Sequence, residues 1–197
     1  MSDRRILFIP KEYSAIIAVL LAIVVSVLDG TIMNIALPTL TESFHISAST
    51  SIWLINAYQL VIAILLLPMS SLGEIYGYRR IFLMGVSLFT VASFSCALCN
   101  DFVTLTIARI IQGMGAACIM SVNPALIRLI YPPEFLGRGM GINAMVIAVS
   151  AAAGPSIAGS ILSIASWHWL FLINIPIGIL AFVLGRKLLP ENIEKGT

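Results

Sequence analysis

Two charged residues lie inside long apolar stretches of the sequence, where a charge needs a partner or a function. Asp29 falls within LDGTIMNIALP (28–38), and Arg109 within ARIIQGMGAA (108–117). A charged side chain at the centre of a membrane-spanning helix costs at least about 2.5–3.5 kcal/mol. A carboxylate in such a place can exchange a proton or meet a cationic ligand, and a nearby guanidinium can bias its protonation.

The expected depths of these two residues in a membrane are similar. Asp29 lies nine residues before Pro38, the expected outer end of its helix, and Arg109 lies six residues after Val103, the expected outer start of another. A rise of 1.5 Å per residue places them roughly 13 and 9 Å below one surface. Two interpretations stay open: a structural ion pair between two helices, or two groups that line a hydrated cavity.

The helix that carries Asp29 presents different side chains on different faces. Residues three, four and seven positions after Asp29 share its face. They are Ile32, Met33 and Ala36, whereas Gly30, Asn34 and Pro38 share another face. Polar and apolar surface therefore alternate around this helix end, which suits a helix that touches partners on several sides.

The composition predicts an all-α integral membrane protein. Hydrophobic residues make up 59% of the chain and charged residues 10%, with a mean hydropathy of +1.03. An ordinary soluble domain carries about 25% charged residues. Six apolar stretches have the length of about 20 residues that crosses a bilayer. We expect them at 14–37, 51–70, 80–99, 103–123, 139–164 and 169–188, joined by loops that include 71–79 and 124–138.

The basic residues predict the orientation, because positively charged loops stay in the cytoplasm. Ten of the eleven fall on one side of the predicted membrane: Arg4, Arg5, Lys11, Arg79, Arg80, Arg128, Arg138, Arg186, Lys187 and Lys195. The eleventh is Arg109, inside the fourth span. The segments 1–13 and 189–197, and hence both termini, are therefore expected in the cytoplasm, and the chain in the cell membrane.

Several other classes of site are not indicated. The three cysteines lie in apolar segments and do not supply enough ligands for a metal cluster. The basic residues are dispersed, which gives no nucleic-acid-binding block. An intramembrane enzyme would need a nucleophile and a base at one depth, yet both histidines, His45 and His168, lie at expected outer loops.

Five blocks, in order along nearly the whole chain, resemble motifs of the major facilitator superfamily. The closest resemblance is to its drug:proton antiporters of the EmrB/QacA type, which have fourteen spans. The blocks are 28–38 in the first span, WLINAYQL (53–60) in the second, motif A (70–80), motif B (109–117) and antiporter motif C (150–160). A sixth patch, Trp167 to Gly178, also fits. Motif A departs from the family pattern at Ser70, Glu74, Ile75 and Tyr78, and motif C at Ser150 and Ala158.

The resemblance implies a fold and a set of site residues. The fold is a six-helix half-bundle of two inverted three-helix repeats, the N-terminal half of such a transporter. The implied proton- and substrate-coupling residues are Asp29, Arg109, Asn34 and Gln112. The motif A residues are Glu74, Gly77, Arg79 and Arg80, and the motif C residues are Gly154, Pro155 and Gly159.

The implied function is proton-coupled efflux of amphipathic or cationic small molecules. A proton gradient would supply the energy, with no cofactor. Because substrate is held between two halves, the chain would act as a homodimer or beside a separate C-terminal half. The alternative is a truncated remnant that cannot transport and persists as an interaction partner in the membrane.

Overall fold

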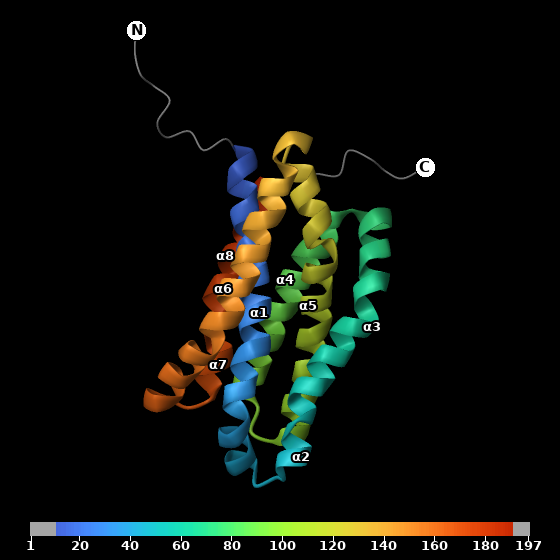
Figure 1. Cartoon of the computed structure of the whole chain (residues 1–197). Helices are drawn as coiled ribbons and strands as arrows, with labels where there is room; N and C mark the ends of the chain where they lie inside the picture. The colour runs from blue at the N-terminus through green and yellow to red at the C-terminus, as the bar shows by residue number, and fades with distance from the viewer. Residues whose placement is uncertain (1–10, 191–197) are drawn as a thin grey trace.

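The structure, a computed structural model, describes residues 11–190, and its described part is helical with short connections (Figure 1). Six of its segments are long and apolar enough to cross a membrane. The elements are α1 (Lys11–Phe44), α2 (Ala48–Ser51), α3 (Trp53–Tyr76), α4 (Tyr78–Leu98), α5 (Phe102–Ile130), the 3-10 turn η1 (Pro133–Phe135), α6 (Leu136–Ile164), α7 (His168–Leu172) and α8 (Asn174–Leu188).

The long helices run side by side in one bundle (Figure 1). α5 packs against α3 and α4, while α1 packs against α5, α6 and α8. Two apolar clusters fill the interior, one around Phe82 and Phe89 and one around Met33 and Phe171. α1 is therefore the central helix, in contact with spans from both ends of the sequence.

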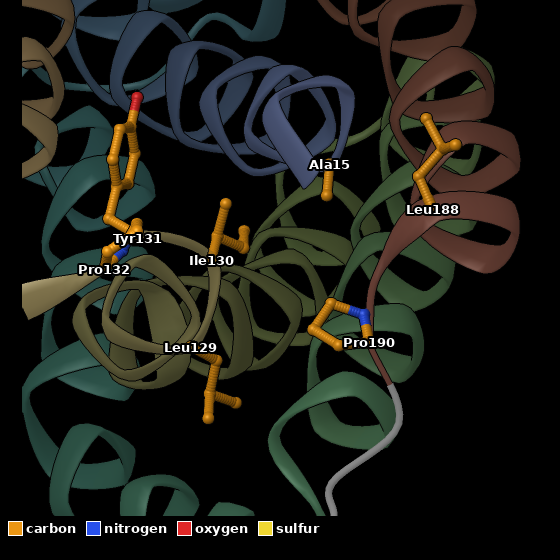
Figure 2. A pocket seen from close by; sticks show the side chains of 7 residues that line it. All are labelled: Ala15, Leu129, Ile130, Tyr131, Pro132, Leu188 and Pro190. Atoms are coloured by element: carbon orange, nitrogen blue, oxygen red, sulfur yellow. The ribbon is translucent and has the colours of Figure 1, made fainter. Parts of the chain in front are cut away.

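The start of α1 and the ends of α5 and α8 meet at one end of the bundle. A hollow of about 400 Å³ lies between them, lined by Ala15, Leu129, Ile130, Tyr131, Pro132, Leu188 and Pro190 (Figure 2). Apart from the tyrosine hydroxyl, its side chains are apolar, and neither Asp29 nor Arg109 lines it. The buried charges must therefore be sought inside the bundle.

The connection expected at 71–79 is much shorter in the structure. α3 continues to Tyr76 and α4 begins at Tyr78, so Gly77 alone joins them. Its φ of 102° lies in a region that favours glycine, and its N–H donates to the carbonyl of Gly73 at 3.0 Å. One residue with positive φ therefore replaces the expected loop.

The expected sixth span is split into α7 and α8 at Ile173. Pro176 explains the break, because proline has no N–H and its ring clashes with the carbonyl four residues earlier, here that of Leu172. α8 therefore begins at Asn174, in the interior of the bundle, where this residue is 1% exposed.

Asp101 caps the start of α5, outside the membrane-spanning segments. Its carboxylate accepts hydrogen bonds from the backbone N–H of Thr104 at 2.9 Å and from the Thr104 hydroxyl at 2.6 Å. The hydroxyl bond, followed by the backbone bond, holds the pKa of Asp101 below its usual range. The cap satisfies an N–H at the start of the helix that has no partner within it.

Candidate functional site

Asp29 lies near the middle of α1 with three donors on its carboxylate. Oδ1 accepts hydrogen bonds from Gln112 Nε2 at 2.9 Å and from Asn174 Nδ2 at 2.8 Å. Oδ2 forms an ion pair with Nη1 of Arg109. Both oxygens of the carboxylate therefore have partners, which come from α5 and α8.

Arg109 comes from α5 and is fully buried. Besides the ion pair with Asp29, its Nη1 donates to Gln112 Oε1 at 2.7 Å, and Nε donates to the carbonyl of Leu54 at 3.4 Å. Its Cζ lies 4.0 Å from the ring centroid of Tyr58 and 5.9 Å from that of Phe171. Aromatic faces attract a cation, and desolvation strengthens this attraction.

Gln112, one helical turn after Arg109, links the pair to α4. Its Nε2 donates to Asp29 and also to Ser93 Oγ at 2.9 Å, and its Oε1 accepts from Arg109 and, at 3.6 Å, from the thiol of Cys96. Both donors and both acceptor sites of the carboxamide are thus used. Such a saturated amide fixes the orientation of the groups around it.

The resulting network draws on α1, α3, α4, α5 and α8, five of the six spans. Its members are buried: Asp29 is 2% exposed, Arg109 and Gln112 0%, and Asn174 1%. The sequence left two interpretations open, an ion pair between two helices or two groups that line a hydrated cavity. In this structure Asp29 and Arg109 form an ion pair that is buried inside the bundle. A role of these residues in proton exchange stays a prediction.

Asn34 does not belong to this network, although sequence analysis placed it with the coupling residues. Its side chain is exposed, and its amide donates to the carbonyl of Gly30 on its own helix at 3.3 Å. The expected division of faces on this helix is confirmed, since Ile32, Met33 and Ala36 are buried while Asn34 and Pro38 are exposed.

Two residues of the network, Asn174 and Ser93, were not among the site residues predicted from the sequence. An amide between two isoleucines in an apolar span is a signal that could have indicated Asn174, because a buried amide needs partners. Ser93 gives no comparable signal, since a serine in a helix can bond a carbonyl one turn earlier. It does so here, donating to the Phe89 carbonyl at 2.8 Å.

Comparison with known proteins identifies the family of this chain. A model of the Major Facilitator Superfamily matches residues 19–196, nearly the whole chain. The chain belongs to this superfamily. Its fold is accordingly a six-helix half of the superfamily type, in a multi-pass membrane protein. Because this is a family of transporters, the prediction that the chain is not an enzyme is confirmed.

Relatives in the superfamily are longer than this chain. The uncharacterized transporter YebQ of Escherichia coli is 55% identical over 93% of this chain and 40% of its own length. The riboflavin transporter RibZ of Clostridioides difficile is 36% identical over 93% of the chain and 40% of its own length. The drug efflux pump JefA of Mycobacterium tuberculosis is 34% identical over 89% of this chain and 35% of its own length. The chain thus spans about two-fifths of the length of the curated relatives it matches.

The residues predicted to form motif A surround the tight connection at Gly77. Glu74 and Arg80 are exposed, whereas Arg79 is half-buried and its Nη2 donates to the carbonyl of Arg186 at 2.5 Å. Arg186 lies in the last turn of α8, where carbonyls have no partner within the helix. Arg79 therefore connects the start of α4 to the end of the sixth span.

The residues predicted to form motif C lie within α6, which continues through Pro155. Gly154 is buried against α1: a Cβ there would meet Thr31 Oγ1, and Thr31 Cβ at 2.8 Å. Pro155 and Gly159 are exposed, and a Cβ at Gly159 would meet nothing within 4 Å. Of the three predicted motif C residues, Gly154 makes the close helix contact within this bundle.

Gly154→Ala should lower the free energy of unfolding by about 1–2 kcal/mol, because the added methyl overpacks the contact with Thr31. Gly159→Ala should instead raise it by about 0.5–1 kcal/mol, since it removes the entropic cost of a helical glycine in open space. Thermal unfolding in detergent compares the two variants. Equal effects at both positions would contradict the assignment. Thr31→Ala removes the hydroxyl but keeps Cβ, so it should restore only part of the stability of Gly154→Ala.

Proposed function

We propose that the chain forms the N-terminal half of a proton-coupled exporter of amphipathic or cationic small molecules, of the drug:proton antiporter type. A second six-helix half, either another copy of this chain or a separate C-terminal half, would complete the substrate path between the two halves. The proton gradient across the cell membrane would drive export, without a cofactor.

The observation that carries this proposal is the buried pair of Asp29 and Arg109. An ionisable residue within a membrane span is expensive and is most often retained for function. Two further partners hold the carboxylate: Gln112, on the same span as Arg109, and Asn174, on the sixth span. Arg109 and Gln112 in turn contact α3 and α4, so a change in the charge of Asp29 would affect a network that spans five helices.

The proposed step is a reversible proton transfer to Asp29. The proton bonds to a carboxylate oxygen, the charge of Asp29 is neutralised, and the attraction to Arg109 falls. Arg109 then needs a new partner, so the arrangement of α1 and α5 favoured by the ion pair loses stability. Release of the proton restores the pair, which gives two states with different helix contacts.

Exposed amides within the membrane spans support a substrate path. Asn34 of α1 and Asn56 and Gln59 of α3 are all exposed, and all lie within candidate spans. Polar side chains within membrane spans rarely face lipid and usually face a bundle interior or a water-filled cavity. We therefore assign these amides to the cavity that the second half would close, where they would supply uncharged hydrogen-bonding groups for an amphipathic substrate.

Further observations support a cytoplasmic location of both termini and the direction of export. The start of α1 and the end of α8 lie at the same end of the bundle (Figure 1), as an even number of spans requires. Within the described residues, the helix ends at that end of the bundle carry Arg79, Arg80, Arg128, Arg138, Arg186 and Lys187, which suits the cytoplasm. JefA is a drug efflux pump by name. Export of a small molecule from the cytoplasm is consistent with this orientation and with the name of this relative.

The proposal is tested by reconstituting the chain in vesicles, alone and together with the remaining part of YebQ. A lipophilic cation such as tetraphenylphosphonium should accumulate when the vesicle interior is made acidic, and a protonophore should abolish this. Asp29→Asn should abolish the dependence on the gradient, because an amide cannot take up the proton. Flux that is equal with and without the gradient, or unchanged in Asp29→Asn, would contradict the proposal.

A further inference from the structure

Asn174 is the residue of the sixth span that reaches the buried carboxylate. Its Nδ2 donates to Asp29 Oδ1 at 2.8 Å, across 145 positions of the sequence. It is the first residue of α8, directly after the break at Ile173. The hydrogen bond therefore holds the sixth span at the point where its helix is interrupted.

Packing holds the first turns of α8 against a second helix, α4. A Cβ at Gly178, one turn after Asn174, would meet Thr90 Oγ1 of α4, and Thr90 Cβ at 3.2 Å. This contact depends on shape alone and does not change with charge. The bond from Asn174 to Asp29 does depend on charge, because a hydrogen bond to an ionised acceptor is about twice as strong as one to a neutral acceptor.

The ionisable groups around Asp29 come from several helices. Arg109 of α5 pairs with it, Tyr58 of α3 lies under the guanidinium, and Cys96 of α4 donates to Gln112. α7 carries His168, which stacks on Trp167, while the ionisable residues of α6 and α8 are Arg138, Arg186 and Lys187, near the ends of their helices. Asn174 itself is neutral, so it can report the charge of Asp29 without titrating.

We propose that Asn174 is a positioning residue that couples the protonation of Asp29 to the sixth span. Its amide stabilises the ionised carboxylate and keeps the start of α8 on α1. When Asp29 takes a proton, this bond weakens and the α7–α8 break is released from α1. The inference rests on the proposed function because it requires that Asp29 takes up a proton. It adds that the sixth span responds to this protonation.

Infrared difference spectroscopy of the reconstituted chain tests the first half of this inference without any transport. Protonated Asp29 should give a carboxyl C=O band that is missing in Asp29→Asn. Asn174→Leu, of similar size, removes the donor, so the carboxylate should take its proton at higher pH. We expect the midpoint of the band to rise by about one pH unit, a roughly tenfold gain in proton affinity.

Two further variants make this test specific. Asn143→Leu is the matched control, because Asn143 is a buried amide of α6 outside the Asp29 network, and it should leave the midpoint unchanged. Asn174→Ser keeps a hydroxyl donor and should give an intermediate midpoint; it also serves if Asn174→Leu does not fold. An unchanged midpoint in both Asn174 variants would overturn the inference but leave the proposed function intact. A chain without any Asp29-dependent band would overturn both.

Hydrogen–deuterium exchange tests the second half, the response of the sixth span. At one pH, Asp29→Asn imitates the neutral carboxyl and Asn174→Leu removes the bond, so both should speed exchange of the backbone amides at 172–178 severalfold. The α6 segment around Gly154 should keep its exchange rate, because it packs on α1 through Thr31. Exchange at 172–178 equal to that of the unaltered chain would overturn the coupling.

Discussion

Arg109→Met should lower the free energy of unfolding by about 3–5 kcal/mol, because it removes one partner of a buried ion pair and leaves the other charge uncompensated. Methionine fills a similar volume, so the loss reflects the charge and the hydrogen bonds to Asp29, Gln112 and Leu54. Thermal unfolding in detergent can be followed by the reaction of the three buried thiols with a fluorogenic reagent. The midpoint should fall by roughly 10 °C.

The double variant Asp29→Leu/Arg109→Met separates the charge from the packing. Replacing both partners by apolar side chains of similar size is often neutral or stabilising, so most of the lost stability should return. Arg109→Lys should restore less than half of the loss, because an ammonium is a point charge and cannot reproduce the planar set of donors of a guanidinium. A double variant as unstable as Arg109→Met would show that the pair is not the cause.

The sequence predicted the central pair because Asp29 and Arg109 are both charges in apolar surroundings, and residue counting placed them at similar depths. That counting took Pro38 as the end of the first helix, which was wrong: α1 continues through Pro38 to Phe44, so Asp29 lies farther from its helix end than Arg109 does from the start of α5. The same counting separates Asn34 from Asp29, since five residues turn a helix by about 140° from the starting direction. The resemblance to the family had grouped Asn34 with Asp29, and the geometry of one helix decides against a shared environment.

Asn174 could not be paired with Asp29 from the sequence, because the contact depends on which helices become neighbours. The first and last spans meet across the bundle, and no local pattern encodes that approach. The positions at which helices end could not be predicted from the sequence pattern either. Polar residues such as Ser71 and Glu74 suggested a loop, yet the backbone continues its helical hydrogen bonds to Tyr76, where Gly77 ends them.

Glycines look equivalent in the sequence, but the space around each one differs. α4 and α5 approach so closely that Gly85 and Gly115 face each other: a Cβ on Gly85 would lie 2.9 Å from the Gly115 carbonyl oxygen. Gly141, on α6, has nothing within 4 Å of its Cβ position. Small residues at helix interfaces permit such backbone contact, which is a main source of packing in membrane bundles.

Gly115→Ala should destabilise the protein by about 3 kcal/mol, at the upper end of the usual cost of overpacking. The new Cβ would meet Phe89 N at 2.5 Å, Phe89 Cα at 2.8 Å and the Gly85 carbonyl oxygen at 2.9 Å. All three are backbone atoms of α4, so no side chain can rotate away and the two helices must separate. The network around Gln112, one turn earlier on α5, should loosen with them, since its bond to Ser93 joins the same two helices.

Gly141→Ala is the matched control and should change stability in the opposite direction. With open space around it, alanine removes the entropic cost of glycine in a helix and should raise the free energy of unfolding by about 0.5–1 kcal/mol. The thiol-reaction assay measures both variants, and Gly115→Ala should also expose Cys118, which packs on the same helix pair. A loss at Gly115 no larger than about 0.5 kcal/mol would mean that α4 and α5 can separate freely, and that the Asp29 network does not depend on their contact.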